Sequence, residues 1–194
     1  YQGNDSVDSA TCKSCPSGRY LIDDEIDAAE HQRLDQCLFC EKGKQFKDDA
    51  TECTVCIEGK YQEQNNAANA VCKFCAAGRE FTYSHAACSI CGGGRYQNSS
   101  NTPSVACLAC KVNQFLLDDK DTVENHDSSS DCVNCPRGKF VPIPGHARFC
   151  ENCRLGTKAD GNGEFCVDCV AGKFGDLDQN FDSACVQCPT GYSQ

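Results

Sequence analysis

Apolar side chains are few along this chain, and the aromatic ones recur at one place in a repeated pattern. Ten Cys-x-x-Cys pairs set the pattern, and in nine of them an aromatic residue follows the second cysteine by four to six positions. Only the copy after Cys153 has none. Because no larger core is available, each ring is expected to pack over a neighbouring disulfide or turn. The nine aromatics are Tyr20, Phe46, Tyr61, Phe81, Tyr96, Phe115, Phe140, Phe174 and Tyr192.

The residues between the cysteine pairs are mostly polar and contain regular turn signals. Glycine stands three residues after the second cysteine in nine copies, and Asn113 takes its place in the tenth. Asparagine is the next-best residue for a left-handed backbone, so positive φ is predicted in every copy. In Cys15-Pro16-Ser17-Gly18, Pro at the second and Gly at the fourth position fit a type I turn that leads into a strand. The pattern predicts a small disulfide-rich repeat protein, an elongated array of short β-hairpin and turn modules with little helix.

Two loops are longer than the others, with 21 residues each, at 16–36 and 111–131. They share an aromatic, two apolar residues, two aspartates and a later histidine, which indicates an internal duplication. Apolar residues at helical spacing predict a short helix in the first loop, capped by Asp23 or Asp24. The second loop carries three consecutive serines at 128–130 and is expected to be looser.

The composition argues against a single packed core. Leu, Ile, Val and Phe together make up 34 of 194 residues, whereas 20 are cysteine. With so little apolar volume, burial alone would hardly offset the chain entropy, so covalent or metal cross-links are required. No apolar run approaches the length of a membrane span. The polar start at Tyr1, without an initiator Met, indicates a mature or excised part of a longer precursor.

Every cysteine belongs to one of the ten pairs, and two kinds of cross-link suit this spacing: disulfides and four-cysteine zinc sites. The net charge of −10 argues against a nucleic-acid partner and hence against the zinc modules that often serve one. Sequons for N-glycosylation at Asn4 and Asn98 have meaning only in a secretory route. These features favour disulfides at Cys12, Cys15, Cys37, Cys40, Cys53, Cys56, Cys72, Cys75, Cys88, Cys91, Cys107, Cys110, Cys132, Cys135, Cys150, Cys153, Cys166, Cys169, Cys185 and Cys188.

No pattern in the chain predicts catalysis, a cofactor or a metal site. Asp176, Asp178 and Asn180 alternate as calcium ligands do, but Phe181 and Gln187 stand where an EF-hand requires Gly and Glu. We interpret this segment as a solvated acidic turn. Ten Cys-x-x-Cys copies cannot all be redox sites, the four histidines are scattered, and no strained nucleophile turn is recognisable. The chain is therefore not expected to be an enzyme.

Residues 12–20 and 132–140 both read Cys-x-x-Cys-Pro-x-Gly followed by a basic and an aromatic residue. This unit resembles the ephrin-receptor-like cysteine-rich repeat and is similar to the cysteine-rich domains of tumour necrosis factor receptors. Long arrays of Cys-x-x-Cys also look like the cysteine-rich surface antigens of ciliates, which are protists. The resemblance covers nearly the whole chain and implies ladders of small modules, with cysteines bonding from one motif to the next.

Two pairings are compatible with such a ladder. The favoured one joins motifs two by two, from Cys12–Cys37 with Cys15–Cys40 to Cys166–Cys185 with Cys169–Cys188, and gives ten disulfides. It divides one continuous array into modules at 1–50, 51–86, 87–130, 131–164 and 165–194. The alternative bonds each second cysteine to the next first cysteine, as in Cys56–Cys72, and leaves Cys12 and Cys188 for partners beyond the chain ends.

Two functions are compatible with these features. The first is an extracellular structural repeat protein of a surface coat, matrix fibre or filament, because every copy repeats scaffold residues. Its partners would be neighbouring repeats or further copies, with glycans on the surface. The alternative is the ligand-binding ectodomain of a cell-surface receptor. Exposed aromatic or Arg residues in irregular loops would mark that function, and the candidates are Phe149 with Arg148 and Phe81 with Tyr83.

Overall fold

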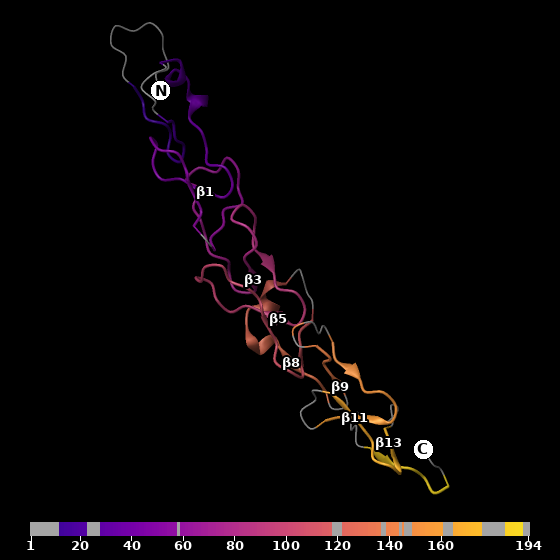
Figure 1. The fold of residues 1–194 in the computed structure, drawn as a ribbon. Coiled ribbons are helices and arrows are strands. Elements are labelled where there is room, and N and C mark those ends of the chain that lie inside the picture. The colour runs from indigo at the N-terminus through magenta and orange to yellow at the C-terminus, as the bar shows by residue number, and fades with distance from the viewer. Residues whose placement is uncertain are drawn as a thin grey trace. The chain divides into compact units, whose positions relative to one another are not determined.

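The computed structural model describes residues 12–22, 28–57, 59–117, 122–136, 139–143, 145, 149–160, 165–175 and 185–191. Within these residues the chain forms seven two-stranded antiparallel sheets, with consecutive strands paired, and four short 3-10 turns (Figure 1). The expected disulfide-rich array of hairpins with little helix is confirmed. The strands are β1 Lys44–Gln45, β2 Thr54–Val55, β3 Arg79–Glu80, β4 Ser89–Ile90, β5 Arg95–Tyr96, β6 Leu108–Ala109, β7 Gln114–Phe115, β8 Val133–Asn134, β9 Lys139–Phe140, β10 Glu151–Asn152, β11 Thr157–Ala159, β12 Cys166–Asp168, β13 Lys173–Phe174 and β14 Val186–Gln187.

Each hairpin is built from the same two pieces of sequence. Its first strand follows the glycine position of one motif, and its second strand contains the two residues between the cysteines of the next motif. In the hairpin of β1 and β2, Lys44 lies opposite Val55 and Gln45 opposite Thr54. The Cys56 N–H then donates to the Gly43 carbonyl at 2.8 Å. The equivalent bond recurs from Cys110 to Gly94, Cys169 to Gly156 and Cys188 to Gly172.

The backbone at the glycine position is left-handed, as predicted. Gly59 has φ of 79° and Asn113 has φ of 59°. The other described glycines of this position, Gly18, Gly43, Gly78, Gly94, Gly156, Gly172 and Gly191, also have positive φ, and Gly138 lies outside the described residues. The hydrogen-bonded turn starts one residue later than expected, because the Arg19 N–H donates to the Pro16 carbonyl and places Gly18 third in the turn.

Nine disulfides join the second cysteine of each motif to the first cysteine of the next. We call this arrangement the disulfide ladder. The favoured two-by-two pairing was therefore wrong, and so was the expectation of ten disulfides, because Cys12 and Cys188 are free. The bonds are Cys15–Cys37, Cys40–Cys53, Cys56–Cys72, Cys75–Cys88, Cys91–Cys107, Cys110–Cys132, Cys135–Cys150, Cys153–Cys166 and Cys169–Cys185.

The direction of side chains on a strand explains this pairing. Successive side chains of a strand point to opposite faces, so residues three apart also face opposite ways. Cys53 and Cys56 flank β2 in this relation. Cys53 bonds back to Cys40, and Cys56 bonds forward to Cys72. The bond Cys40–Cys53 spans the predicted module boundary at residue 50, so the modules on either side are covalently linked.

Aromatic rings and disulfides together form the small cores of the chain. In the first core Tyr20 packs with Cys40, Cys53 and Ala70, and Phe46 lies against them. The second core combines Cys75, Cys88 and Val105 with Tyr61 and Phe81, and the third combines Cys110, Leu116 and Cys132 with Tyr96. The expected packing of the ring over a disulfide is confirmed at these positions.

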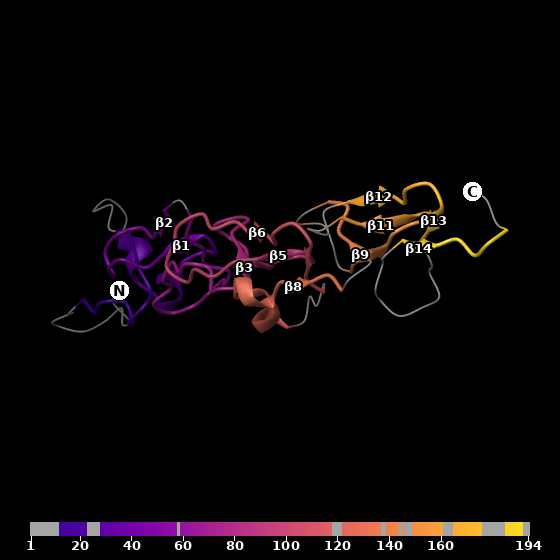
Figure 2. The ribbon, with the colours of Figure 1, turned by 90° about the horizontal axis from the view of Figure 1, so that it is seen from below.

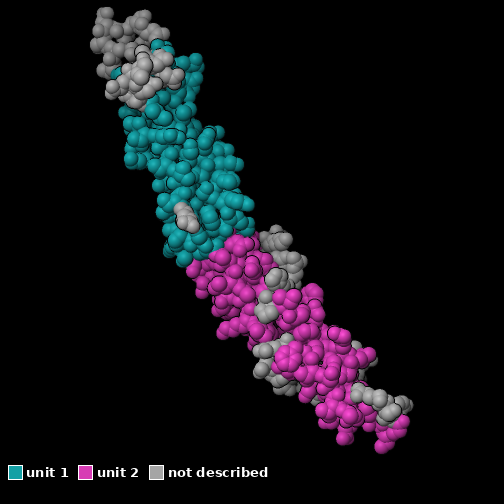
Figure 3. All heavy atoms as spheres, in the orientation of Figure 1, with its two compact units in different colours: residues 1–76, 81–89, 100–105 teal, residues 77–80, 90–99, 106–194 magenta. Residues whose placement is uncertain are grey.

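The chain divides into two compact units. Unit 1 comprises residues 1–76, 81–89 and 100–105, and unit 2 comprises residues 77–80, 90–99 and 106–194 (Figure 3). Unit 1 contains the first two cores, and unit 2 contains the third. Within unit 2, strands β9 and β11–β14 lie together in the part coloured orange to yellow in Figure 2.

The second long loop is more ordered than its sequence predicted. It contains 3-10 turns η3 (Val123–His126) and η4 (Ser129–Asp131), whereas the first long loop contains η1 (Ala28–His31) and η2 (Leu34–Gln36). Ser128 caps η4, because its side chain accepts the Ser130 N–H and its own N–H donates to the Asp131 carboxylate. The serine run therefore stabilises the turn instead of loosening it. His126 is fully buried, and its Nδ1 lies 3.0 Å from the Arg95 carbonyl oxygen.

Candidate functional site

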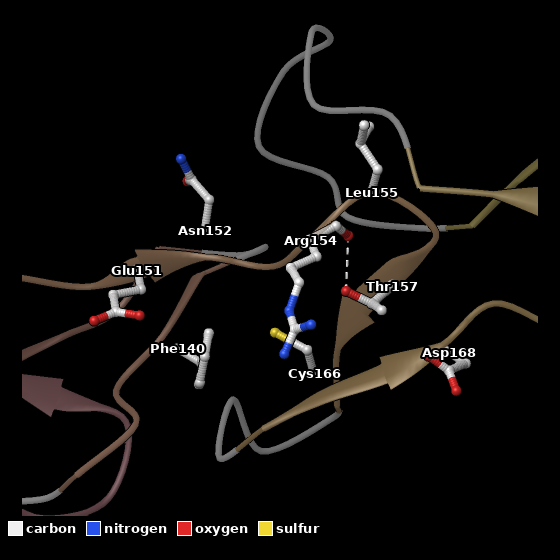
Figure 4. A pocket seen from close by; sticks show the side chains of 8 residues that line it. All are labelled: Phe140, Glu151, Asn152, Arg154, Leu155, Thr157, Cys166 and Asp168. Carbon is white, nitrogen blue, oxygen red and sulfur yellow. Dashed lines mark hydrogen bonds between the residues drawn. The ribbon is translucent and has the colours of Figure 1, made fainter.

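A cavity of about 590 Å³ lies in unit 2 between two successive hairpins, β9–β10 and β11–β12. Its lining residues, shown in Figure 4, are Phe140, Glu151, Asn152, Arg154, Leu155, Thr157, Cys166 and Asp168. Both the disulfide Cys153–Cys166 and the aromatic ring of the preceding motif therefore border the cavity.

Strand register explains why these side chains meet. In the hairpin of β11 and β12, Thr157 lies opposite Asp168 and Ala159 lies opposite Cys166. These two pairs share one face of the hairpin, because side chains alternate along a strand. In the preceding hairpin Phe140 lies opposite Glu151. The half-buried ring of Phe140 forms part of the cavity wall.

Arg154 supplies the positive charge of the cavity. Its side chain extends toward Phe140 and the sulfur of Cys166 (Figure 4). Its carbonyl oxygen accepts two hydrogen bonds from Thr157, from the backbone N–H at 3.0 Å and from Oγ1 at 2.8 Å. These bonds fix the turn from which the arginine projects. A planar guanidinium can stack on an aromatic face or bind a carboxylate with two parallel hydrogen bonds.

The rim of the cavity is polar and acidic. Glu151 and Asp168 are exposed carboxylates, and Asn152 is an exposed amide. The cavity thus combines one aromatic wall with several polar groups that could orient a ligand. Among the described residues, no group of three or more His, Cys, Asp or Glu side chains is arranged to hold a metal ion.

The sequence singled out only part of this site. Phe140 was predicted as a scaffold aromatic, and Arg154, Glu151 and Asp168 were not predicted to have a role. The feature of the sequence that could have indicated this site is the copy after Cys153, which is the one copy without an aromatic residue.

Other sequence candidates are dispersed over the chain. Tyr83 is 64% exposed and stacks on His85, whereas Phe81 is half-buried in the second core. Phe149 is 62% exposed, and Arg148 lies outside the described residues. Asn98 is exposed, as a glycosylation site requires. Asn4 and the acidic segment from Asp176 to Asp182 also lie outside the described residues.

Comparison with protein-family models and with curated proteins found no match for this chain. The described helices include none of the length and apolar character that crossing a bilayer would require. Nine disulfides in one chain are typical of secreted and extracellular proteins, because oxidising compartments are where disulfides persist.

Proposed function

We propose that this chain is a structural repeat module of an extracellular assembly, such as a surface coat, matrix fibre or filament. The observation that carries the proposal is the disulfide ladder. Each of the eight motifs between the first and the last bonds to both neighbours, and the same hairpin recurs with the same hydrogen bond from the second cysteine to the glycine position. Repeat chains of this kind supply length and resistance to proteolysis, because each unit needs only its neighbours for stability.

The two free cysteines support assembly through the same bonds. Cys12 is the first cysteine of its motif and is exposed, whereas Cys188 is the second of its motif and is half-buried. A bond between Cys188 of one copy and Cys12 of another would have the second-to-first order of the nine bonds in the structure. Thiol–disulfide exchange with glutathione disulfide would form it and release two molecules of glutathione.

The direct test is the form of the protein in its native source. Electron microscopy of that material should show rods or filaments many modules long, and non-reducing electrophoresis should show covalent oligomers that reduction converts to one band. Isolated monomers in a membrane would contradict the proposal. In solution the monomer should have a radius of gyration well above the roughly 16 Å of a compact globule of this length, since an elongated array is predicted.

Glycans are the expected surface modification of such a module. Asn98 is exposed and Ser100 completes its sequon, so the acceptor amide is accessible. Peptide mass mapping of native material should find glycan on Asn98. Unmodified Asn98 would remove one of the two supports for a secretory route, and the disulfides would remain as the other.

A second candidate function, the ectodomain of a receptor, is favoured by one observation. The cavity beside Phe140 and the exposed rings of Tyr83 and Phe149 give the chain side chains of the kind that dominate protein interfaces. A receptor would be found as a membrane-attached monomer that binds one protein ligand. The microscopy described above therefore distinguishes the two functions.

A further inference from the structure

The hairpin of β11 and β12 beside the cavity lacks an aromatic ring that two other hairpins have. Phe46 follows Cys40 by six residues, and Phe81 follows Cys75 by six residues. Both rings pack against a core that contains that cysteine and its disulfide partner. Six residues after Cys153 the chain has Ala159.

The strand register confirms that these positions are equivalent. Gln45 lies opposite Thr54 in an antiparallel pair, so the next residue, Phe46, lies opposite Cys53. Ala159 lies opposite Cys166, which is the same place in its own hairpin. The disulfides Cys40–Cys53 and Cys153–Cys166 have the same sequence separation, 13 residues. The two hairpins therefore differ at this position by the loss of a phenyl ring.

The surroundings of Cys166 show the consequence of that loss. Cys53 is only 5% exposed in the core against which Phe46 packs, whereas Cys166 is half-buried and lines the cavity. The ring of the preceding motif is present in both places, as Tyr20 in the first core and as Phe140 beside the cavity. One wall of an aromatic site is thus in place, and position 159 carries no ring to complete it.

We infer that this cavity is a binding site for an aromatic ring, such as the side chain of tyrosine or phenylalanine on a partner protein. The ring would lie over Cys166 and against Phe140, in the place that Phe46 takes against the core of Tyr20 and Cys53. The Arg154 guanidinium, which the first core does not have, offers a cationic face for stacking. Thr157 and Asp168 on the same face offer an acceptor for a phenolic hydroxyl.

The experiment uses the full-length oxidised protein and N-acetyl-tyrosinamide as the probe. Two-dimensional amide NMR should show shifts at Thr157, Cys166 and Asp168 as the probe is raised to on the order of 10 mM, the range suited to one small aromatic group. Ala159→Phe restores the repeat and fills the space, so probe affinity should fall by about tenfold or more. Lys158→Phe places the same ring one residue away, on the opposite face of β11, and should leave affinity within about twofold.

A second variant covers the case in which Ala159→Phe does not fold. Arg154→Ala enlarges the cavity and removes the cationic face, so affinity should fall by about two- to fivefold. The inference is overturned if the probe shifts none of the cavity amides in the unmodified protein. It is also overturned if Ala159→Phe folds and binds the probe as well as the unmodified protein does.

Discussion

The hairpins closed by Cys40–Cys53 and by Cys153–Cys166 have the same covalent plan and different cores. In the first, Tyr20 and Phe46 pack on the disulfide, and both cysteines are buried. In the second, Phe140 lines an open cavity, and Cys166 is half-buried. The two hairpins therefore share their disulfide and glycine position and differ in the aromatic residues around the disulfide and in the exposure of its second cysteine.

The same contrast extends along the chain. Every cysteine from Cys37 to Cys132 is buried, whereas from Cys135 to Cys185 only Cys153 is. We refer to these as the covered region and the open region. The cysteines of the three cores found among the described residues lie in the covered region, and loop residues such as Ala70 and Val105 complete the first two cores.

The largest difference is expected at a glycine. Gly59 and Gly172 have similar positive φ, 79° and 82°, so alanine is strained by about 1 kcal/mol at both. A Cβ at Gly59 would also overlap the backbone of Pro103 and Ser104, whereas at Gly172 nothing lies within 4 Å. Gly59→Ala should therefore lower the free energy of unfolding by about 3 kcal/mol or more, and Gly172→Ala by about 1 kcal/mol. Equal losses in denaturant unfolding of the two variants would contradict the distinction between the regions.

Truncating an aromatic should give the next largest effect. Phe46 packs against the first core, whereas Phe174 is half-buried outside the three cores. Phe46→Ala should lower the free energy of unfolding by about 2 to 3 kcal/mol, and Phe174→Ala by about 1 kcal/mol or less. Thermal or urea unfolding of both variants measures the difference. A larger loss for Phe174→Ala would show that the open region has a core of its own.

Mild reduction should open the disulfides of the open region first. A reductant must reach sulfur, and Cys169 and Cys185 are half-buried whereas Cys75 and Cys88 are buried. Under native conditions Cys169–Cys185 should react about tenfold faster than Cys75–Cys88, because exchange rate depends on access. Timed alkylation followed by peptide mass analysis gives both rates. The opposite order would mean that coverage by the aromatic cores does not protect sulfur.

Surface charge should contribute least. Lys44 Nζ lies 3.2 Å from a Glu52 carboxylate oxygen, and this hydrogen bond raises the pKa of Lys44. A raised lysine pKa stabilises the fold below the ordinary value of about 10.4, and the contribution is lost as pH rises through the folded value. Because Glu52 is exposed and screened by solvent, Glu52→Gln should change stability at pH 7 by under about 0.5 kcal/mol. A loss above 1 kcal/mol in urea unfolding would show that charge pairs, and not only rings, hold the covered region.

Much of the repeat followed from the sequence because few residues can perform its tasks. Positive φ was predictable from Gly59 and Asn113, since few other residues adopt a left-handed backbone at low energy. The packing of the Phe81 ring in a core with a disulfide was predictable, since the composition provides no larger core. The sequence shows that the copy after Cys153 has no aromatic residue. It does not show where the missing ring would lie, because that requires the strand register, which places Ala159 opposite Cys166.

The disulfide pairing did not follow from the sequence. Loop lengths suited both schemes, and the deciding fact was that Cys53 and Cys56 flank a strand and so face opposite ways. The order of the second long loop was also not predictable from composition. Ser128 completes a capping box only because Asp131 lies three residues later and accepts its N–H.

Tryptic mapping of the unreduced protein tests the disulfide ladder most directly, because Lys73 lies between Cys72 and Cys75. Cleavage there separates peptide 61–73 from peptide 74–79. The ladder predicts that the bond Cys56–Cys72 joins peptide 61–73 to peptide 48–60. It also predicts that the bond Cys75–Cys88 joins peptide 74–79 to peptide 80–95. Recovery of peptides 61–73 and 74–79 bonded together to peptide 48–60 would show the two-by-two pairing and contradict the ladder.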